Sequence, residues 1–318
     1  MRRFENNVSI AGILVKHTLE ETTYGDGIEC IRGEVIIRTE DGGEHEVKFF
    51  ANKYKKGADG NFTSDENQIY KSLVTVMSEY KTLEEYPDDP DFVQITSASF
   101  GVNDYVSKNT GEITTINPVS SNFINRVDKS KIETTPSVAK FEVEGVIDSI
   151  KDETIKNEPT GNLIVTLNVI NQTRTGTGKD AVYEVKNMFP LRLFVTSDLA
   201  DNFRGIYSEG CFTKLSGVLI NKTETVTKTE TQAFGSDLVK TFTNIVRHNE
   251  ITSGSAPISI YEAELTDDIC NQLISQRKAV LAEVKNGKTS TATSSSPAPS
   301  TGGNPFAAKT AKNPFAKK

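Results

Sequence analysis

The stretch Val8-Ser9-Ile10-Ala11-Gly12-Ile13-Leu14 alternates apolar residues with small or polar ones, as a half-buried β-strand does. The stretch Phe141-Glu142-Val143-Glu144-Gly145-Val146-Ile147 repeats this alternation, with glycine at the same place, 133 positions later. The phrases Phe62-Thr63-Ser64-Asp65 and Val195-Thr196-Ser197-Asp198 are separated by the same spacing. Two matches at one spacing predict that the chain contains a duplicated domain.

Each copy is predicted to contain the same order of elements. After the first stretch come two β-rich runs separated by the turn Asp41-Gly42-Gly43, which is typical of a hairpin. Each Thr-Ser-Asp phrase is expected to begin a helix, with Ser64 or Asp65 as the N-cap of the first. Apolar residues then recur every three or four positions, and further strands start at Phe92 and Phe212. The predicted order is three strands, one helix and two strands, twice.

This order, with a glycine in the first long strand, resembles the OB-fold, a five-stranded Greek-key barrel with a helix between its third and fourth strands. The sequence therefore predicts a mainly β chain with two OB-fold barrels, at 1–130 and 138–258, joined by a linker at 131–137. Residues 259–285 are predicted to form a C-terminal helix. Residues 286–318 are rich in Ser, Thr, Pro, Ala, Gly and Lys, and we expect a disordered basic tail.

Charge is distributed unevenly along the 318 residues. The chain has 36 basic and 43 acidic residues and a net charge of -7, with a mean hydropathy of -0.40. From Asn286 onward there are only lysines among the charged residues, so the rest of the chain is more acidic than the total. An acidic body argues against a surface that binds nucleic acid everywhere, but it allows one basic channel.

Three cysteines, Cys30, Cys211 and Cys270, fit neither a zinc site nor a disulfide framework, which suits a reducing cytoplasm. We expect no signal peptide and no membrane span, because no apolar window approaches about 18 residues. The histidines His17, His45 and His248 show no helical pairing, and His45, beside a hairpin turn, is expected to be solvated.

Catalytic patterns are weak. The acidic residues from Glu84 to Asp91 are interpreted as a solvated loop rather than a metal site, because Pro87 and Pro90 interrupt them. The phrase Gly176-Thr177-Gly178-Lys179 lacks the first glycine and the Ser or Thr of a phosphate-binding loop. We therefore predict no enzymatic activity, no cofactor and no metal.

The expected third strand of the first barrel carries the most informative pattern. Period-2 alternation places Val47, Phe49 and Ala51 in the barrel. The predicted nucleic-acid-binding residues on the opposite face and just after it are Lys48, Phe50, Asn52, Lys53, Tyr54, Lys55 and Lys56. Aromatic rings that stack on bases, beside lysines that neutralise phosphates, are typical of single-strand binding. The alternative is that Phe50 packs under the helix or against the second barrel and that the lysines only solubilise.

The second barrel repeats this theme less clearly. Arg192 and Phe194 are predicted to face outward, with Lys186 nearby. The long hairpin from Asn221 to Phe242 is either a mobile arm or a plain β-ribbon. Its candidate binding residues are Lys222, Lys228, Phe234 and Lys240. In the first barrel the candidates outside the third strand are Tyr105, Lys108 and, more weakly, Arg126.

The tail contains one motif twice, Asn304-Pro305-Phe306-Ala307 and Asn313-Pro314-Phe315-Ala316. An aromatic after proline in a disordered segment is a ready anchor for a partner pocket, so Pro305, Phe306, Pro314 and Phe315 are predicted to bind a partner. The alternative is low-complexity drift. Bacterial-type single-strand binders end in an acidic stretch closing on Pro-Phe, whereas lysines surround the motif in this chain.

Paired barrels with such a tail resemble the tandem OB-fold single-stranded DNA-binding proteins of double-stranded DNA bacteriophages. The resemblance implies a non-enzymatic protein of the host cytoplasm that coats and protects exposed strands in phage DNA replication, recombination or repair. It also implies that the tail recruits replication or recombination proteins. RNA binding is not separable from DNA binding by sequence. The alternative is a protein-interaction or virion structural protein built from paired β-barrels.

Overall fold

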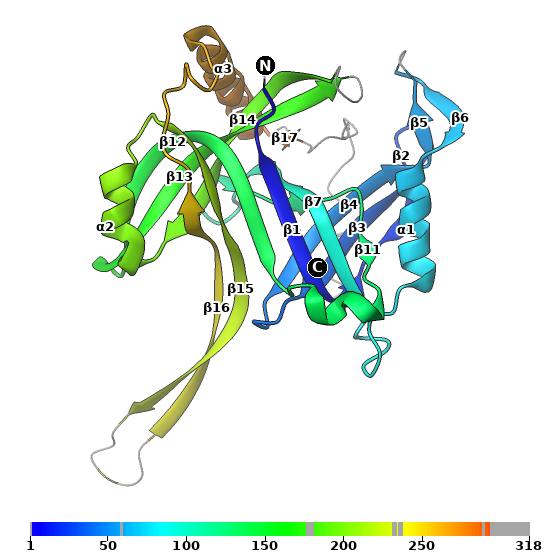
Figure 1. Cartoon of the computed structure of the whole chain (residues 1–318), viewed down its shortest axis with the longest axis horizontal. Helices are drawn as coiled ribbons and strands as arrows, with labels where there is room; N and C mark the ends of the chain where they lie inside the picture. The colour runs from blue at the N-terminus through cyan, green and yellow to red at the C-terminus, as the bar shows by residue number, and fades with distance from the viewer. Residues whose placement is uncertain are drawn as a thin grey trace, which may run out of the picture.

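The computed structural model describes residues 2–57, 60–175, 181–230, 234, 238–287 and 290–292. The chain is mainly β-structure, arranged as two barrels side by side with a helix beside each (Figure 1). This confirms the fold class predicted from the sequence. The predicted tail motifs, with Pro305, Phe306, Pro314 and Phe315, lie outside the described residues.

The first barrel is a closed sheet of five strands. They are β1 (Asn6–His17), β3 (Ile28–Arg38), β4 (Glu44–Asn52), β7 (Phe92–Phe100) and β10 (Val119–Ser120). They pair in the order β1-β3-β4-β10-β7 and back to β1, and only the β4–β10 pair is parallel. This is the strand order of an OB barrel, in which the fifth strand lies between the third and the fourth.

The second barrel repeats this order. Its strands are β12 (Ala139–Ile155), β13 (Glu158–Thr175), β14 (Val182–Val195), β15 (Phe212–Glu230) and β16 (Leu238–Gly254). They pair as β12-β13-β14-β16-β15 and back to β12, again with one parallel pair, β14–β16. The duplication is therefore present at the level of topology.

Each barrel has its helix between the third and fourth strands, as predicted: α1 (Gln68–Glu79) and α2 (Ser197–Ile206). The predicted start of α1 was wrong. Its N-cap is Asn67, whose side chain accepts a hydrogen bond from the Ile69 N–H at 3.0 Å. Ser64 and Asp65 instead lie in β6 (Phe62–Glu66), which pairs with β5 (Tyr54–Lys56).

The β5–β6 hairpin is thus an insertion in the first copy, since α2 of the second copy follows β14 directly. Thr196 is the N-cap of α2, but Thr63 lies in a strand, so the spacing that the two phrases share does not join equivalent positions. The equivalence of the two copies rests on the glycines. A side chain on Gly12 would place Cβ 2.2 Å from the Arg38 carbonyl oxygen, and one on Gly145 would place it 2.2 Å from that of Asn168. Both strands need glycine because the neighbouring backbone lies against them.

Outside the barrels lie shorter elements. They are β2 (Glu20–Tyr24), β8 (Val102–Val106), β9 (Ile113–Ile116), β11 (Asn125–Arg126), the 3-10 helix η1 (Lys129–Thr134), α3 (Asp267–Lys285) and β17 (Ser290–Ala292). The predicted C-terminal helix exists as α3, although a turn segment precedes it. Strand β17, which lies within the segment predicted to be a disordered tail, pairs with β8.

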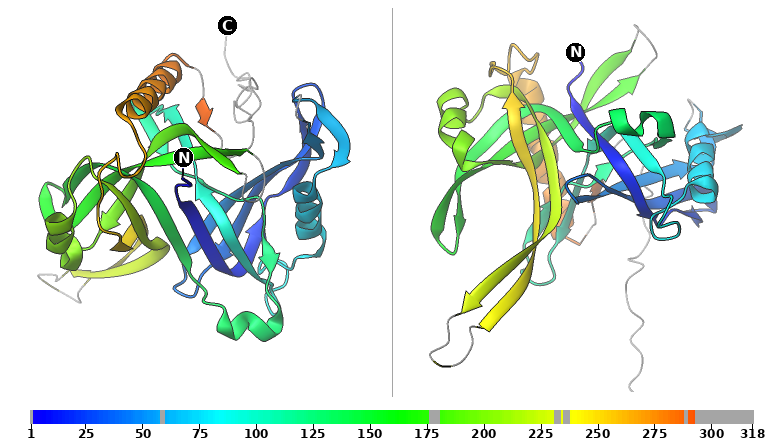
Figure 2. Two further views of the ribbon diagram at one scale, coloured as in Figure 1. Left: turned by 45° about the horizontal axis from the view of Figure 1, so that its top comes forward. Right: turned by 60° about the horizontal axis from the view of Figure 1, so that its bottom comes forward.

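The two barrels join through their first strands. β1 pairs antiparallel with β12 (Figure 2). The paired run extends from Asn6–Val143 to Ile10–Ala139, and at its centre Val8 lies opposite Phe141. Val8 and Phe141 are equivalent positions of the two copies, because they precede Gly12 and Gly145 by the same number of residues. Equivalent residues face each other only on a two-fold axis, so the barrels are related by an approximate two-fold axis at this pair.

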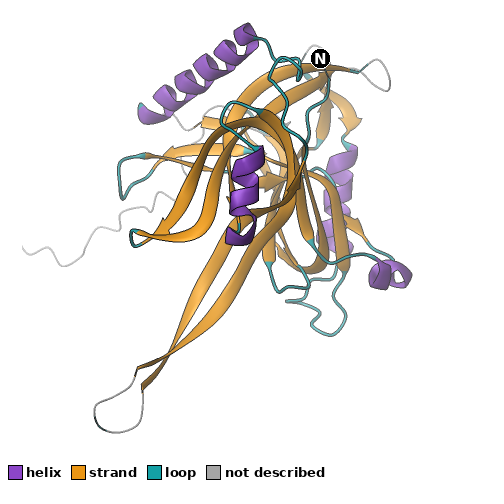
Figure 3. Ribbon diagram, turned by 60° about the vertical axis from the view of Figure 1, so that its left-hand side comes forward, coloured by secondary structure: helices purple, strands orange, loops and turns teal. Residues whose placement is uncertain are grey.

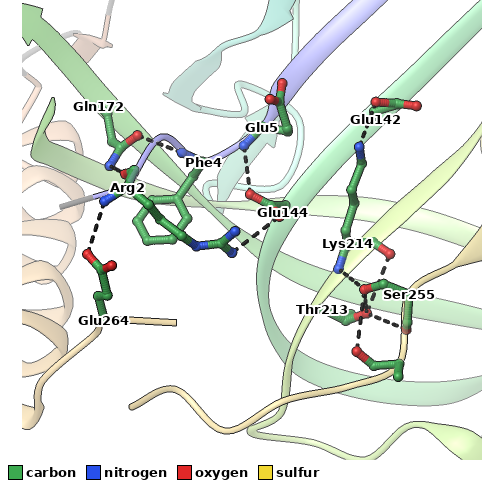
Figure 4. A network of polar contacts seen from close by, with 11 residues as sticks. Arg2, Phe4, Glu5, Glu142, Glu144, Gln172, Thr213, Lys214, Ser255 and Glu264 are labelled. Carbon is green, nitrogen blue, oxygen red and sulfur yellow. Dashed lines mark hydrogen bonds and ion pairs between the residues drawn. The ribbon is translucent and has the colours of Figure 1, made fainter. Parts of the chain in front are cut away.

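The N-terminal segment packs on the second barrel rather than on the first (Figure 4). The Arg2 guanidinium lies 3.2 Å from the buried Glu144 carboxylate. The Phe4 N–H donates to the Gln172 side chain at 2.7 Å, and the Phe4 ring lies 5.4 Å from the Phe212 ring. Residues 2–5 therefore tie the beginning of the chain to the second copy.

Candidate nucleic-acid interface

A groove of about 510 Å³ runs between the two barrels. Its first wall comes from β4 and from the connection between β9 and β10, and its second wall from β14, β15 and β16. The charged and aromatic side chains at its surface include Glu46, Lys48, Arg192, Phe194, Arg247 and His248. Both barrels thus contribute to one concave surface.

Two asparagine side chains bridge the walls. The Asn117 amide of the first barrel donates to the Pro190 carbonyl oxygen at 3.1 Å, and the Asn221 amide of the second barrel donates to the Glu44 carbonyl oxygen. Glu44 lies opposite Arg38 and Pro190 lies opposite Asn168, and these partners are the residues whose carbonyls approach the two glycines. The two acceptors therefore occupy equivalent positions, and the bridges hold the walls together.

An aromatic pair stands on the second wall. The Phe194 and His248 rings lie 4.2 Å apart between centroids, with their planes tilted by 32°. Parallel pairing of β14 with β16 places Phe194 opposite Glu250, two residues along β16 from His248. His248 Nε2 lies 3.2 Å from the Glu250 carboxylate, which orients the imidazole. The pair offers a ring surface next to the groove.

Two arginines line the groove together with this pair. Arg192 and Arg247 are both exposed, and the Arg247 Nε–H donates to the Asn221 side-chain oxygen at 3.1 Å. Within the described part of the chain, neither guanidinium lies in a salt bridge. Cations without a carboxylate partner are the groups that phosphates can neutralise without first breaking an ion pair.

The first wall has a different charge balance. Lys48 lies 3.1 Å from Glu34 and 3.9 Å from Glu46. Burial and the neighbouring Glu34 raise the pKa of the Glu46 carboxyl above its ordinary value. The first wall therefore presents a paired lysine and a carboxyl group, whereas the second barrel presents two arginines together with the Glu153 carboxylate.

The predicted alternation of the third strand is present in β4. Val47, Phe49 and Ala51 are buried, and the residues between them are not. However, the Phe50 ring lies 5.8 Å from the Tyr24 ring, and the Tyr24 hydroxyl donates to the Asn52 side chain at 2.7 Å. Tyr24 of β2 therefore contacts the Phe50 and Asn52 side chains, which the sequence predicted to bind nucleic acid.

The strand does not continue to Tyr54, contrary to the prediction. β4 ends at Asn52, and Tyr54 opens β5 in a separate two-stranded sheet with Lys55 and the exposed Lys56. Lys53, between them, is ion-paired with Glu29 at 3.0 Å. The structure therefore separates Tyr54 to Lys56 from the groove wall that contains Lys48.

Arg126 has structural contacts on the side of α1. Its guanidinium lies 4.5 Å from the Tyr80 ring centroid and 2.9 Å from the Asp91 carboxylate, and it donates to the Glu79 carbonyl oxygen at 2.5 Å. These contacts bind β11 to the end of α1. Arg126 is therefore engaged away from the groove.

The remaining candidates lie on hairpins. Tyr105 and Lys108 are exposed on the β8–β9 hairpin, and Lys186 is exposed on β14. The β15–β16 pair extends beyond the barrel as a long two-stranded ribbon (Figure 3). Lys222 lies at its base, Lys228 and Lys240 are opposite each other in register, and Phe234 near its tip is 98% exposed.

Residues 5–287 match the model of the YorF family. The chain belongs to the YorF family. No curated protein sequence matches it.

Among solved structures, the YorF-family chain is similar to the wild-type single-stranded DNA binding protein from Thermus aquaticus. The identity is 11% and the TM-score 0.41, over 81% of this chain and 95% of that one. A deletion mutant of the same protein, which also carries a substitution, gives the same identity and TM-score over 97% of its length. A replication protein A heterotrimer bound to single-stranded DNA is 12% identical, with a TM-score of 0.20, over 78% of this chain and 50% of that one.

Sequence reasoning missed several groove residues of this YorF-family chain. Arg247, His248 and Asn221 were not predicted to bind, although the fifth strand of an OB barrel runs parallel to the third and so lies beside Phe194. That pairing was the signal that could have found them. The prediction of a solvated His45 was wrong: it is only 4% exposed, and burial lowers the pKa of its imidazole to about 4.

The described residues contain no cluster of three or more His, Cys, Asp or Glu side chains that could hold a metal ion. Over the same part of the chain, no helix is long and apolar enough to cross a membrane.

Proposed function

We propose that this chain is a non-enzymatic single-stranded DNA-binding protein and that its main contact is the second wall of the groove. The observation that carries the proposal is the Phe194–His248 ring pair in a groove that Arg192 and Arg247 also line. A base stacked on an aromatic side chain contributes about 1–3 kcal/mol, and the arginines supply the phosphate contacts.

The distribution of charge supports a confined site. The chain carries a net charge of -7, and the first-barrel lysines Lys48 and Lys53 are ion-paired with glutamates. A polyanion is repelled from such a surface in general and attracted where cations are not paired. In this proposal Lys48 contributes less than the sequence pattern alone suggested, and the second barrel contributes more.

The lysines that the sequence predicted to bind on the β15–β16 ribbon lie outside the groove, and in this proposal they make additional contacts with the bound strand. The β15–β16 ribbon starts at Lys222, beside the groove residues Asn221 and Arg247. Further along, the register places two lysines, Lys228 and Lys240, at one level of the ribbon. The ribbon then extends the path of the bound strand beyond the barrel.

We propose further that the protein coats and protects exposed strands in phage DNA replication, recombination or repair. In this proposal the Asn-Pro-Phe motifs at 304–306 and 313–315 recruit replication or recombination proteins. Deleting 304–318 should leave the affinity for single strands nearly unchanged and abolish retention of such proteins, identified by mass spectrometry. A large loss of affinity would instead make the tail a nucleic-acid arm.

Fluorescence anisotropy tests the binding proposal. A labelled oligo-dT, its RNA counterpart and a duplex are titrated at two salt concentrations. We expect salt-sensitive binding to the single strand and much weaker binding to the duplex. The Arg192→Ala variant should weaken binding, whereas Arg204→Ala, which removes an arginine of α2 paired with Asp152, should not. Absence of salt-sensitive binding would favour a protein-interaction or virion structural role for the paired barrels.

A further inference from the structure

The two-fold relation between the barrels extends from the β1–β12 contact to the groove walls. The carbonyls that approach Gly12 and Gly145 belong to Arg38 and Asn168. Across the next pairing, Arg38 lies opposite Glu44 and Asn168 lies opposite Pro190. Glu44 and Pro190 are therefore equivalent positions of the two copies.

Counting outward along β4 and β14 from these positions makes Glu46 equivalent to Arg192, and Lys48 equivalent to Phe194. No bulge interrupts either count. The fourth and fifth strands give an independent check. Val8 lies opposite Ala98 and Phe141 opposite Gly217, so Ser99 and Val218, the next residues, are equivalent. Their fifth-strand partners are Ser120 and Glu250, and these lie opposite Lys48 and Phe194, respectively. The walls therefore share a backbone frame, and these two positions are among those at which they differ.

A two-fold axis has a direct consequence for a bound polymer that has a direction. Rotation about the axis exchanges the two walls and reverses a strand that crosses from one to the other. A groove with identical walls would therefore bind the 5′-to-3′ and 3′-to-5′ arrangements with equal affinity. Any preference for one polarity has to come from positions at which the walls differ.

We propose that the groove holds single-stranded DNA in one polarity and that the unequal pairs Glu46/Arg192 and Lys48/Phe194 set this polarity. The inference rests on the proposed function. The second wall offers a ring and a cation outside any described salt bridge, and the first offers a carboxyl group beside an ion-paired lysine. Reversing the strand would exchange the nucleotides that meet these two chemically different walls.

Photo-crosslinking tests the proposal with the full chain. Two oligo-dT strands are used, one with a photoreactive base at the 5′ end and one with it at the 3′ end, and the crosslinked peptides are assigned to 5–126 or to 139–254. We expect the 5′ probe to label one barrel and the 3′ probe the other, each with a preference of about fivefold or more, as one stacked base provides. Equal labelling of both barrels by both probes would overturn the polarity proposal.

The residues are tested by making the walls alike. The double variant Glu46→Arg with Lys48→Phe gives the first wall the cation and the ring of the second wall at these two positions, so the preference should fall to about twofold or less while binding is kept. The reciprocal variant Arg192→Glu with Phe194→Lys makes the walls alike in the other direction. It should also abolish the preference and bind more weakly, so it is measured at low salt.

Glu142→Arg with Lys214→Phe is the matched control, because it makes the same residue changes at an ion pair of 2.8 Å outside the groove lining. It should retain the preference. Thermal unfolding of each variant confirms folding, and either equalising variant is sufficient if the other does not fold. A preference that survives in a folded equalising variant would show that other residues set the polarity. Failure of the wild-type protein to bind either probe would overturn the proposed function instead.

Discussion

Arg277 in α3 and Asp104 in β8 form a bidentate ion pair in which the aspartate is completely buried. One guanidinium nitrogen lies 2.7 Å from Asp104 Oδ1, and the Thr115 hydroxyl donates to the same oxygen at 2.6 Å. Thr115 also lines the groove. The ion pair therefore joins the helix that follows the second barrel to a hairpin of the first barrel that forms part of the groove wall.

Breaking this pair should strongly destabilise the protein. Arg277→Met leaves the Asp104 carboxylate buried without its cation, and we expect the free energy of unfolding to fall by about 3–5 kcal/mol. Chemical denaturation followed by circular dichroism measures the change. The double variant Arg277→Met with Asp104→Leu should recover much of the stability, because it removes both charges. A decrease below about 1 kcal/mol in the single variant would contradict the account of a buried pair.

The two barrels should contribute unequally to binding. Phe194→Ala should weaken oligo-dT binding by about 1–3 kcal/mol, since it removes a ring at the groove. Phe50→Ala with Tyr54→Ala should have a smaller effect, because Tyr24 contacts the Phe50 ring and Tyr54 lies in the β5 hairpin. Anisotropy titrations of the two variants at one salt concentration make the comparison. A larger effect in the Phe50 and Tyr54 variant would make the first barrel the main site.

His45 should make stability depend on pH. Burial lowers its pKa to about 4, whereas an unfolded histidine has a pKa of about 6.5. The unfolded chain therefore binds the proton more strongly than the folded chain between these values. The His45 contribution is complete above about pH 6.5 and is lost as the pH falls toward about 4.

Comparison with His45→Gln isolates this contribution from that of the carboxylates. Between about pH 7.5 and about pH 4.5, the wild-type protein should lose about 2–3 kcal/mol more stability than the variant. Urea denaturation at each pH provides the free energies. Parallel pH profiles of the two proteins would show that His45 is not buried in its neutral form.

The features that could be predicted from the sequence are those with a local cause. The alternation around Val47 and Phe49 identified an inward and an outward face, because side chains of a strand alternate whatever their partners are. The glycines at 12 and 145 identified the duplication, because the neighbouring carbonyls exclude a side chain at both places. Strand order followed from these patterns and the resemblance that they supported.

The site was less predictable because it depends on non-local pairing. Whether Lys48 is available depends on Glu34, which the β3–β4 register places beside it. The contact of Phe194 with His248 depends on a parallel pairing of strands far apart in the sequence. The start of α1 was mistaken for a different reason, since Ser64 and Asp65 are good N-cap residues but occupy an inserted hairpin.

The salt dependence of binding shows whether the groove arginines neutralise DNA phosphates. For single strands, the slope of log K against log salt decreases in magnitude by about 0.7 for each phosphate that the protein no longer neutralises. The variant Arg192→Ala with Arg247→Ala should therefore reduce the slope for oligo-dT by about 1.4, whereas Arg204→Ala leaves it unchanged. A wild-type slope in the variant without both groove arginines would contradict a groove that binds the DNA backbone.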